Sequence, residues 1–562
     1  MCRVVLEQSA AYTAGQQVAD VTVGQDAVFT LTPAAGWTLT GTDNENAVLE
    51  AIGGGAYRLT VPQVRYTVCI SVTAEQSAER LFYHANGGQR LDGGDADAWV
   101  EQPVSAKHLR RNTSQGADLF VRQGHTLMGW NTAADGSGTA VGLGSRAEAG
   151  AHLYAQWAEW NDAEEFDYTL ANGAVTITGW RGAGESVVVP STLGGAPVTV
   201  IASGAFAGAD CRSVVLPSSL RRIESDAFAG SAVEEVTLFD SLVEVSGYAF
   251  RDCESLQTLH INAATAPVYA ASYYATFADK YDRLSALADA QKLVLFSGSS
   301  TRFGYDSAAL DAAFPAYEVV NMGVFAYTNA LPQLDLIADC LAQNDVLLLS
   351  PEFDAAKRQF CTTNALDEKF FCLIEENYDL AAALDLRRYT GVFAALDSYL
   401  DQRAGLTAGS YELSPADYDE DGSPVTTPSY NEYGDYALYR PNAADDTPIY
   451  GLAVPYTTAA FPQSVYIQPF NAVCEAFRAE GVRVMLTYSP RNREAVSADS
   501  TPEAIAALDA YFRSQLTVPV LTPLEGSLMA GRYFYGTDNH LSTDGVAIRT
   551  AQVIEALQKE GM

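Results

Sequence analysis

The stretch KLVLFSGSSTRFG, residues 292–304, is an apolar run that ends in a turn of small residues with three serines. KLVLF has the length and apolar character of a buried strand, and DSAALDAAF at 306–314 has the pattern of a helix. A strand that leads through a short turn into a helix is the building unit of parallel α/β sheets. The stretch therefore predicts an α/β domain, with its serines exposed at one edge of the sheet.

The same alternation continues through residues 285–562. Further strand-like runs are YEVVNMG, DVLLLSP, VRVMLTYSP and VPVLTP, and the helix-like runs between and after them include LPQLDLIADCLAQ, NAVCEAFRAEG, TPEAIAALDAYFRSQL and TDGVAIRTAQVIEALQKEG. This order predicts a three-layer domain with a mostly parallel sheet and helices on both faces. Ligand sites in such sheets lie at the carboxyl ends of the strands. The residues found there are Ser300, Gly323, Glu352 and Asn492.

His540 is the single histidine of residues 285–562 and lies in YGTDNHLSTDG. A serine nucleophile needs a base to accept its proton, and histidine is the usual base near neutral pH. If this region is a serine hydrolase, His540 is its base. The alternative is an ordinary surface histidine beside a serine-rich turn that caps a helix.

The phrase GSSTRFG, residues 298–304, resembles the first sequence block of SGNH (GDSL-type) hydrolases. The resemblance makes Ser300 the nucleophile, with Ser299 beside it in the substrate or oxyanion site. NMG at 321–323 resembles the second block, in which the glycine donates a backbone N–H to the oxyanion; here that is Gly323. The resemblance to the family covers about 270 residues.

Two positions depart from the SGNH pattern. The third block normally supplies an Asn, but LLSPEFD places Glu352 there, so backbone groups near Ser350 or the side chain of Asn492 are candidates for the second oxyanion donor. TDNH resembles the last block, of the form DxxH, yet Thr537 stands three residues before His540 and Asp538 two before it. We expect Asp538 or a backbone carbonyl to orient the His540 ring.

Residues 165–268 contain an internal repeat. VIASGAFAG, RIESDAFAG and EVSGYAFRD place Phe206, Phe228 and Phe250 at a 22-residue interval, as do LPSSL and LFDSL. A fixed period in the twenties predicts a leucine-rich solenoid with one short strand per repeat and the phenylalanines stacked in the core. GAFAG and LPSSL resemble BspA-type leucine-rich repeats of bacterial surface proteins. The sequence shows about three repeats, which act as a spacer or bind a partner.

Two all-β modules are expected before the repeats. Residues 1–76 read as short alternating strands separated by turn residues, which fits a small β sandwich. Residues 77–158 open with YHANGG, continue with GWNTAADGSGT and close with LYAQW. These phrases resemble the Listeria–Bacteroides repeat, the B-repeat of internalin-type surface proteins, and imply a β-grasp-like module anchored by Trp130 and Trp157.

Composition excludes several classes of function. The chain has 34 Lys and Arg against 69 Asp and Glu, a net charge of −35, which opposes binding to nucleic acid or anionic membranes. The eight cysteines are scattered without zinc spacing, which favours buried free thiols, with a pairing of Cys361 and Cys372 as the alternative. DYDEDGSP at 417–424 resembles the start of a calcium loop, but Pro428 stands where a bidentate acid is needed. No metal, cofactor or membrane span is expected.

The sequence thus predicts a secreted or wall-associated serine esterase of SGNH type that removes acyl groups, acetyl above all, from a glycan. The absence of a signal peptide at the start suggests that the N-terminus is truncated. The expected partners are an acylated glycan or small ester, and a host or cell-wall glycan or protein for the repeats. The alternatives are an O-acyltransferase, a surface adhesin with a degenerate SGNH domain, and sugar binding by the Tyr-rich insertion YNEYGDYALYR at 430–440.

Overall fold

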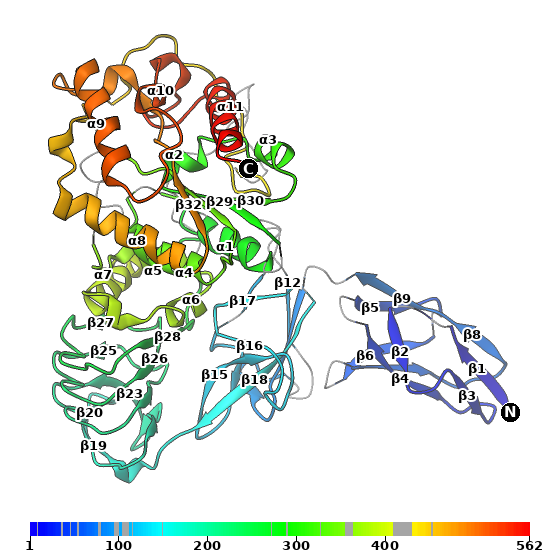
Figure 1. Ribbon diagram of the computed structural model, residues 1–562. Helices are drawn as coiled ribbons and strands as arrows, with labels where there is room; N and C mark the ends of the chain where they lie inside the picture. Colours follow the sequence, from blue (N-terminus) through cyan, green and yellow to red (C-terminus); the bar gives the residue numbers. More distant parts are fainter. Residues whose placement is uncertain are drawn as a thin grey trace. The chain divides into compact units, whose positions relative to one another are not determined.

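The computed structural model describes the chain except residues 8, 10, 35–36, 45, 53–55, 77–79, 95–99, 104–111, 115, 149, 271, 288–289, 326, 354–362, 408–429 and 451–452. Two compact units are present. The first contains Met1–Ala266 and Glu376–Ala382, and the second contains Pro267–Glu375 and Ala383–Met562. The chain is multidomain, with N-terminal β sheets, a leucine-rich repeat region and a C-terminal parallel-sheet α/β region (Figure 1).

The first β module is built from nine strands. They are β1 (Cys2–Leu6), β2 (Tyr12–Ala14), β3 (Val18–Val21), β4 (Ala27–Pro33), β5 (Trp37–Thr42), β6 (Val48–Ile52), β7 (Ala56–Val61), β8 (Val68–Ile70) and β9 (Val72–Gln76). They form sheets in the orders β3-β1-β8, β2-β4-β7-β6 and β5-β9. In β4 every second residue is buried, so Ala27, Phe29 and Leu31 face the core while the residues between them face solvent. The predicted all-β character of residues 1–76 is confirmed.

The second module is a five-stranded sheet in the order β12-β10-β18-β15-β16. Its strands are β10 (Arg80–His84), β12 (Val100–Pro103), β15 (His125–Asn131), β16 (Ala140–Val141) and β18 (His152–Glu159), with β11 (Gln89–Arg90), β13 (Asn112–Thr113), β14 (Phe120–Val121) and β17 (Arg146–Ala147) paired beside them. Trp130 is buried, as predicted, with its ring 4.8 Å from that of Tyr83. Trp157 packs at the margin of this core and donates from Nε1 to Ala85 O at 3.0 Å.

The repeat region has two parallel sheets with four rungs. One sheet aligns β20 (Ala174–Trp180), β23 (Ala196–Ile201), β25 (Arg222–Ile223) and β27 (Glu244–Val245), with β19 (Phe166–Ala171) at its edge and β22 (Thr192–Leu193) on β23. The other aligns β21 (Ser186–Val188), β24 (Ser213–Val215), β26 (Glu235–Phe239) and β28 (Thr258–Asn262). Ile201 pairs with Ile223, and Ile223 with Val245, which confirms the 22-residue step.

The aromatic rings of the repeats form one stack. Phe206, Phe228 and Phe250 lie with ring centroids 4.8 and 4.6 Å apart and nearly parallel planes. Trp180 extends the stack beyond Phe206, at 6.1 Å. The rung that carries Trp180 lacks the Ala-Phe phrase, which explains why the sequence pattern shows fewer repeats than the structure.

The second unit is organised around a parallel sheet in the order β30-β29-β31-β32. Its strands are β29 (Lys292–Phe296), β30 (Glu318–Asn321), β31 (Val346–Leu349) and β32 (Arg483–Leu486). Every residue of β29 and β31 is buried, as expected for strands covered on both faces. At the start of these two strands Lys292 Nζ lies 3.0 Å from Asp345 Oδ2, an ion pair with almost no exposed surface. The predicted mostly parallel sheet is confirmed.

The helices of this unit are α1 (Thr276–Ala286), α2 (Ser299–Arg302), α3 (Ser307–Ala313), α4 (Ala330–Ala338), α5 (Glu368–Ile374), α7 (Val392–Ala404), α8 (Gln468–Ala479), α9 (Pro502–Gln515), α10 (Leu524–Ser527) and α11 (Thr543–Lys559); α6 (Asp379–Ala382) lies in the first unit. A short pair, β33 (Arg491–Asn492) with β34 (Leu528–Met529), completes it. The four long helix-like runs of the sequence correspond to α4, α8, α9 and α11. VPVLTP forms only an isolated bridge between Leu486 and Val520.

Two sequence predictions concern residues that the structure does not describe. The loop at 417–424 and Cys361 are not described, and the loop stays a prediction. Cys372, with which Cys361 could pair, is a free thiol in the structure. The seven cysteines that the structure does describe are free thiols, with Cys69 exposed. Among the described helices, none has both the length and the apolar character that crossing a membrane requires.

Candidate active site

The candidate site lies at the carboxyl ends of the four parallel strands. The chain moves from β29 outward to β30 on one side and then to β31 on the other side, so the sheet has its topological switch point between β29 and β31. Ser299 and Ser300 follow β29, Glu352 follows β31, and Ser489 follows β32. In open α/β sheets such a crevice is where ligands bind.

The serine turn requires glycine in the neighbouring segment. Gly298 precedes the short helix α2, which begins at Ser299. A Cβ atom on Gly323 would lie 2.5 Å from Arg302 N and 2.9 Å from Gly298 O. Because these neighbours are backbone atoms that cannot give way cheaply, Gly323 lets the end of β30 approach the serine turn.

His540 contacts Ser299 rather than Ser300. The distance from His540 Nε2 to Ser299 Oγ is 2.8 Å. Ser300 Oγ lies instead 3.1 Å from Ser489 Oγ, and Ser489 Oγ donates to Ser350 O. Successive side chains of a helix point about 100° apart, so two adjacent serines in α2 cannot both face one imidazole. The expected contact of Ser300 with the base is therefore replaced by one from Ser299.

Aromatic stacking fixes the plane of the His540 ring. The ring lies 4.1 Å from Phe303 with an interplanar angle of 2°, and Phe303 in turn stacks on Tyr436 at 4.4 Å. The backbone N–H of His540 donates to Thr537 Oγ1 at 2.9 Å. Thr537, the residue at the family's usual acid position, thus shapes the turn that presents the histidine.

Asp538 does not orient His540. The carboxylate is buried and accepts from Ile449 N at 2.9 Å, Tyr450 N at 3.1 Å and Asn492 Nδ2 at 2.9 Å. Across the described residues its side-chain hydrogen bonds are these three, and none comes from the imidazole. Asp538 therefore holds the 449–450 segment against the site, which corrects the expected triad role.

Two of the expected oxyanion donors are already bonded within the protein. The N–H of Gly323 donates to Asn321 Oδ1 at 2.9 Å. Asn492 is fully buried, with its Oδ1 accepting from Glu494 N at 3.1 Å and its Nδ2 donating to Asp538. Neither group points at the Ser299–His540 pair as a free donor, so their predicted oxyanion role finds no support in the geometry.

Glu352 binds the backbone of the serine turn. Its Oε1 accepts from Ser300 N at 3.0 Å, and its Oε2 accepts from Asn539 Nδ2 at 3.4 Å. The residue after a nucleophilic serine commonly supplies one backbone N–H to the oxyanion hole. With Ser299 as nucleophile that donor is Ser300 N–H, and the carboxylate oxygen of Glu352 now lies on it.

Hydrogen bonds connect the segment 430–440 to the residues that follow the serine turn. Tyr436 N donates to Arg302 O at 2.9 Å, and Asp435 accepts from Ser307 N, Ser307 Oγ and Asn321 Nδ2, each at 2.7 Å. Asn321 Nδ2 also donates to Thr301 O at 2.9 Å. Asp435 thereby ties this Tyr-rich segment to the start of α3 and the end of β30, and Tyr436 ties it to the end of α2.

Burial shifts the pKa values of two ionisable groups near the serine turn, Lys280 and Asp435. Lys280 Nζ donates to Gly323 O, and desolvation lowers the pKa of Lys280 well below its usual value, with the nearby Arg302 charge acting in the same direction. Desolvation also raises the pKa of Asp435, against the hydrogen bonds from Ser307 and Asn321. No local sequence pattern identifies Lys280 as a neighbour of Gly323, because Lys280 lies in α1, more than forty residues earlier.

A family model of the BspA type leucine-rich repeat region matches residues 197–280 in six copies. These residues are BspA-type leucine-rich repeats. Among solved structures, a leucine-rich repeat protein of T. pallidum is similar, with 22% identity over 39% of this chain and 79% of that chain, and a TM-score of 0.18. No curated protein matches the chain. The repeat match ends before Ser299, so the SGNH resemblance stays a prediction.

Proposed function

We propose that the C-terminal unit is a serine esterase of SGNH type that removes acyl groups, acetyl above all, from a glycan. The observation that carries the proposal is the 2.8 Å contact between Ser299 Oγ and His540 Nε2 at the switch point of a parallel sheet. A hydroxyl within hydrogen-bond reach of an imidazole is the minimal arrangement for nucleophilic catalysis.

In the proposed reaction Ser299 Oγ attacks the ester carbonyl carbon while His540 Nε2 accepts the serine proton. The tetrahedral intermediate collapses, the C–O bond to the sugar breaks, and His540 returns the proton to the departing hydroxyl. Water then attacks the acyl-Ser299 ester with His540 again as base, releasing the carboxylic acid and the free serine. Ser300 N–H supplies an oxyanion donor once Glu352 moves away from it.

Transfer of the acyl group to a second hydroxyl is a close variant of this chemistry. It uses the same acyl-Ser299 intermediate, with an alcohol in place of water at the second step. Product analysis with and without a soluble glycan acceptor separates hydrolysis from O-acyl transfer.

Two observations favour a non-enzymatic role. The carboxylate of Glu352 lies on Ser300 N–H, and Asp538 is bonded away from His540. A surface adhesin with a degenerate SGNH-like unit would need neither group in a catalytic position. The BspA-type repeats fit either role, and with either the protein would be secreted or attached to a bacterial surface, where the repeats meet a host or cell-wall glycan or protein.

The experiment compares Ser299→Ala with Ser300→Ala on p-nitrophenyl acetate, followed by labelling with a fluorophosphonate. We expect Ser299→Ala to lose about 10³-fold or more in kcat and to lose the label, since the nucleophile is removed. Ser300→Ala keeps the label and most of the rate. Turnover that survives in both variants, or wild-type protein that takes no label, argues for the adhesin.

A further inference from the structure

The turn that carries His540 is a narrow hairpin, and Tyr535 lies opposite His540 in it. Phe534 and Leu541 form an antiparallel bridge, and Tyr535 N donates to His540 O at 2.9 Å. Residues that lie opposite each other in an antiparallel pair carry their side chains on the same face, with Cβ atoms about 5 Å apart. The side chain of Tyr535 is therefore a direct neighbour of the imidazole that contacts Ser299.

Burial shows which face of the hairpin these two side chains occupy. Phe534 and Leu541 are fully buried and belong to one core cluster, together with Met529. Side chains alternate between the two faces along paired strands, so Tyr535 and His540 point away from this core. Tyr535 is 41% exposed, which places an accessible aromatic ring beside the proposed base.

Asp538 fixes a second exposed tyrosine at the same hairpin. Its carboxylate is buried and accepts from Ile449 N at 2.9 Å and from Tyr450 N at 3.1 Å. Charge-assisted bonds from two successive backbone N–H groups are strong, so Tyr450 has a defined position next to the turn that presents His540. Tyr450 is 63% exposed, so it projects its ring into solvent.

Arg440 holds the other strand of the hairpin. Its Nε donates to Leu541 O at 2.7 Å, its backbone N–H donates to Thr543 Oγ1 at 3.0 Å, and its carbonyl accepts from Thr543 N at 3.0 Å. The backbone that carries Tyr450 and Tyr535 is thus tied to the rest of the unit. Little ordering entropy is lost when a ligand contacts side chains on such a support.

Two exposed tyrosines beside a nucleophilic serine suit a sugar ring. One face of a pyranose consists mainly of C–H groups, which pack against an aromatic ring, while the tyrosine hydroxyl can bond to the sugar hydroxyls. In an ester of a glycan the sugar is the alcohol that leaves, so it lies next to the bond that breaks. Binding energy from this part of the substrate can be used to lower the reaction barrier.

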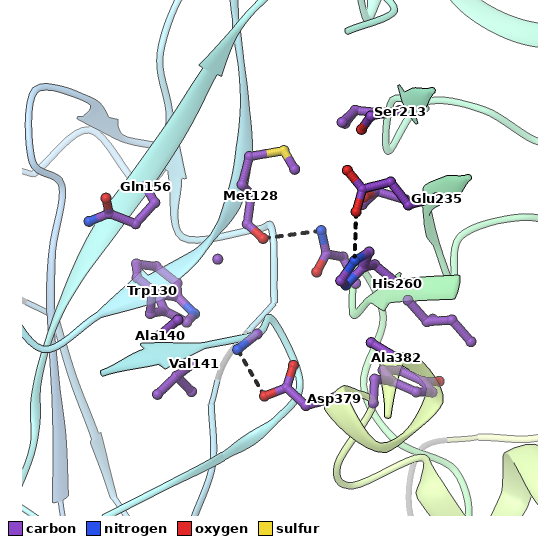
Figure 2. A pocket seen from close by; sticks show the side chains of 17 residues that line it. Met128, Trp130, Ala140, Val141, Gln156, Ser213, Glu235, His260, Asp379 and Ala382 are labelled. Carbon is purple, nitrogen blue, oxygen red and sulfur yellow. Dashed lines mark hydrogen bonds and ion pairs between the residues drawn. The ribbon is translucent and has the colours of Figure 1, made fainter. Parts of the chain in front are cut away.

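The first unit offers another hollow, a cavity of about 480 Å³ between the second β module and the repeats (Figure 2). Trp130, His260 and Tyr378 are among the residues that line it. Trp130 and Tyr378 are each only 1% exposed, so neither can offer a ring face to a sugar. The exposed rings of the second unit are therefore the better match for a glycan.

We propose that Tyr535 and Tyr450 form the platform on which the sugar of the ester substrate stacks, and that they determine a preference for glycan esters over simple alkyl esters. This role rests on the proposed esterase function and concerns the alcohol part of its substrate. Tyr535 contacts the sugar that carries the ester, because it lies beside His540. Tyr450, held by Asp538, extends the contact along the glycan.

The test uses two acetate esters that share the acyl group and differ in the alcohol, the tetraacetate of methyl β-glucopyranoside and ethyl acetate. Release of acetate by the full chain gives kcat/KM for each ester. We expect Tyr535→Ala to lower kcat/KM about tenfold on the sugar ester and to leave it unaltered on ethyl acetate, because only the sugar stacks on the ring. Tyr450→Ala has the same selective effect, whereas Tyr535→Phe keeps the ring and most of the rate on the sugar ester.

Two control variants change side chains outside this platform. Tyr168→Ala removes a tyrosine that is 39% exposed in the repeats, and His260→Ala alters the cavity of the first unit. Both should hydrolyse the two esters as the wild type does. An equal loss on both esters in Tyr535→Ala, or no loss on the sugar ester, overturns the platform while the esterase stands. Wild-type protein that releases acetate from neither ester overturns the proposed function, and the platform with it.

Discussion

Ser299 and Ser300 are adjacent in the sequence, yet only Ser299 contacts His540. The sequence places both serines at the carboxyl end of a buried strand, and the structure confirms that position. It does not confirm their predicted exposure, because both side chains are buried. Which of them faces His540 depends on the rotation of α2, since neighbouring side chains in a helix point about 100° apart. The block alignment counts positions and contains no information about that rotation, so it favoured Ser300, whereas His540 contacts Ser299.

Asp538 is a second residue whose contacts differ from the sequence prediction. A carboxylate two residues before the base is a reasonable candidate to orient the ring. Its partners are the backbone N–H groups of Ile449 and Tyr450, almost ninety positions earlier in the chain. Two such donors to a carboxylate are strong, charge-assisted bonds, and they hold it away from the imidazole. The plane of His540 is set instead by Phe303, which no catalytic motif singles out.

The charge of Glu352 is expected to affect the reaction directly. If the site is an esterase, a carboxylate oxygen on Ser300 N–H repels the oxyanion that forms beside it. We expect Glu352→Gln to raise kcat on p-nitrophenyl acetate about tenfold, because the neutral amide keeps the shape and removes the charge. Glu494→Gln, an exposed change nearby, is the control and should leave kcat unaltered. A lower kcat in Glu352→Gln would show that the carboxylate assists the reaction.

At the scale of elements, the sequence predicts most of the parallel sheet. Continuous apolar runs such as KLVLF become strands buried on both faces, and the strongly periodic runs become α4, α8, α9 and α11. VPVLTP fails as a strand because pairing with β32 is limited to Val520 at its centre. Apolar composition predicts that a segment is buried. A β-strand also needs a neighbouring strand that runs beside it for several residues, so that their backbones can form hydrogen bonds.

The aromatic stack of the repeats supports an element-scale prediction. Phe228 is fully buried between Phe206 and Phe250. Phe228→Ala would leave a cavity in the middle of the stack and destabilise the repeats by about 3–5 kcal/mol. We expect hydrogen exchange to rise in peptides from 197–262 and not in those from α11. Tyr248→Ala, at a side chain that is 67% exposed, is the matched control. Unchanged exchange in Phe228→Ala would mean that the rungs do not depend on the stack.

At the scale of the whole molecule, the sequence motifs predict the order of the modules. They do not predict that a segment of the C-terminal half belongs to the first unit. Residues 376–382 are separated by more than a hundred positions from the rest of the first unit, yet they belong to it. Arg146 Nη2 lies 3.2 Å from Glu376 Oε2, and both side chains are almost fully buried. Pairings between residues so distant in sequence leave no local pattern from which they could be predicted.

Because residues 376–382 belong to the first unit, we expect them to become accessible to protease when that unit is removed. Tyr378 is 1% exposed in the full chain, and its hydroxyl donates to Asp240 Oδ2 at 3.4 Å. A fragment of residues 267–562 lacks Asp240 and the rest of the first unit, so Tyr378 and its neighbours lose the partners that bury them. We expect chymotrypsin to cleave after Tyr378 at least about tenfold faster in the fragment than in the full chain, because cleavage follows the population of the open segment. Cleavage after the exposed Tyr535 is the internal reference, and it should proceed equally in both proteins. Equal protection of Tyr378 in the fragment would show that the 376–382 segment is held by the second unit instead.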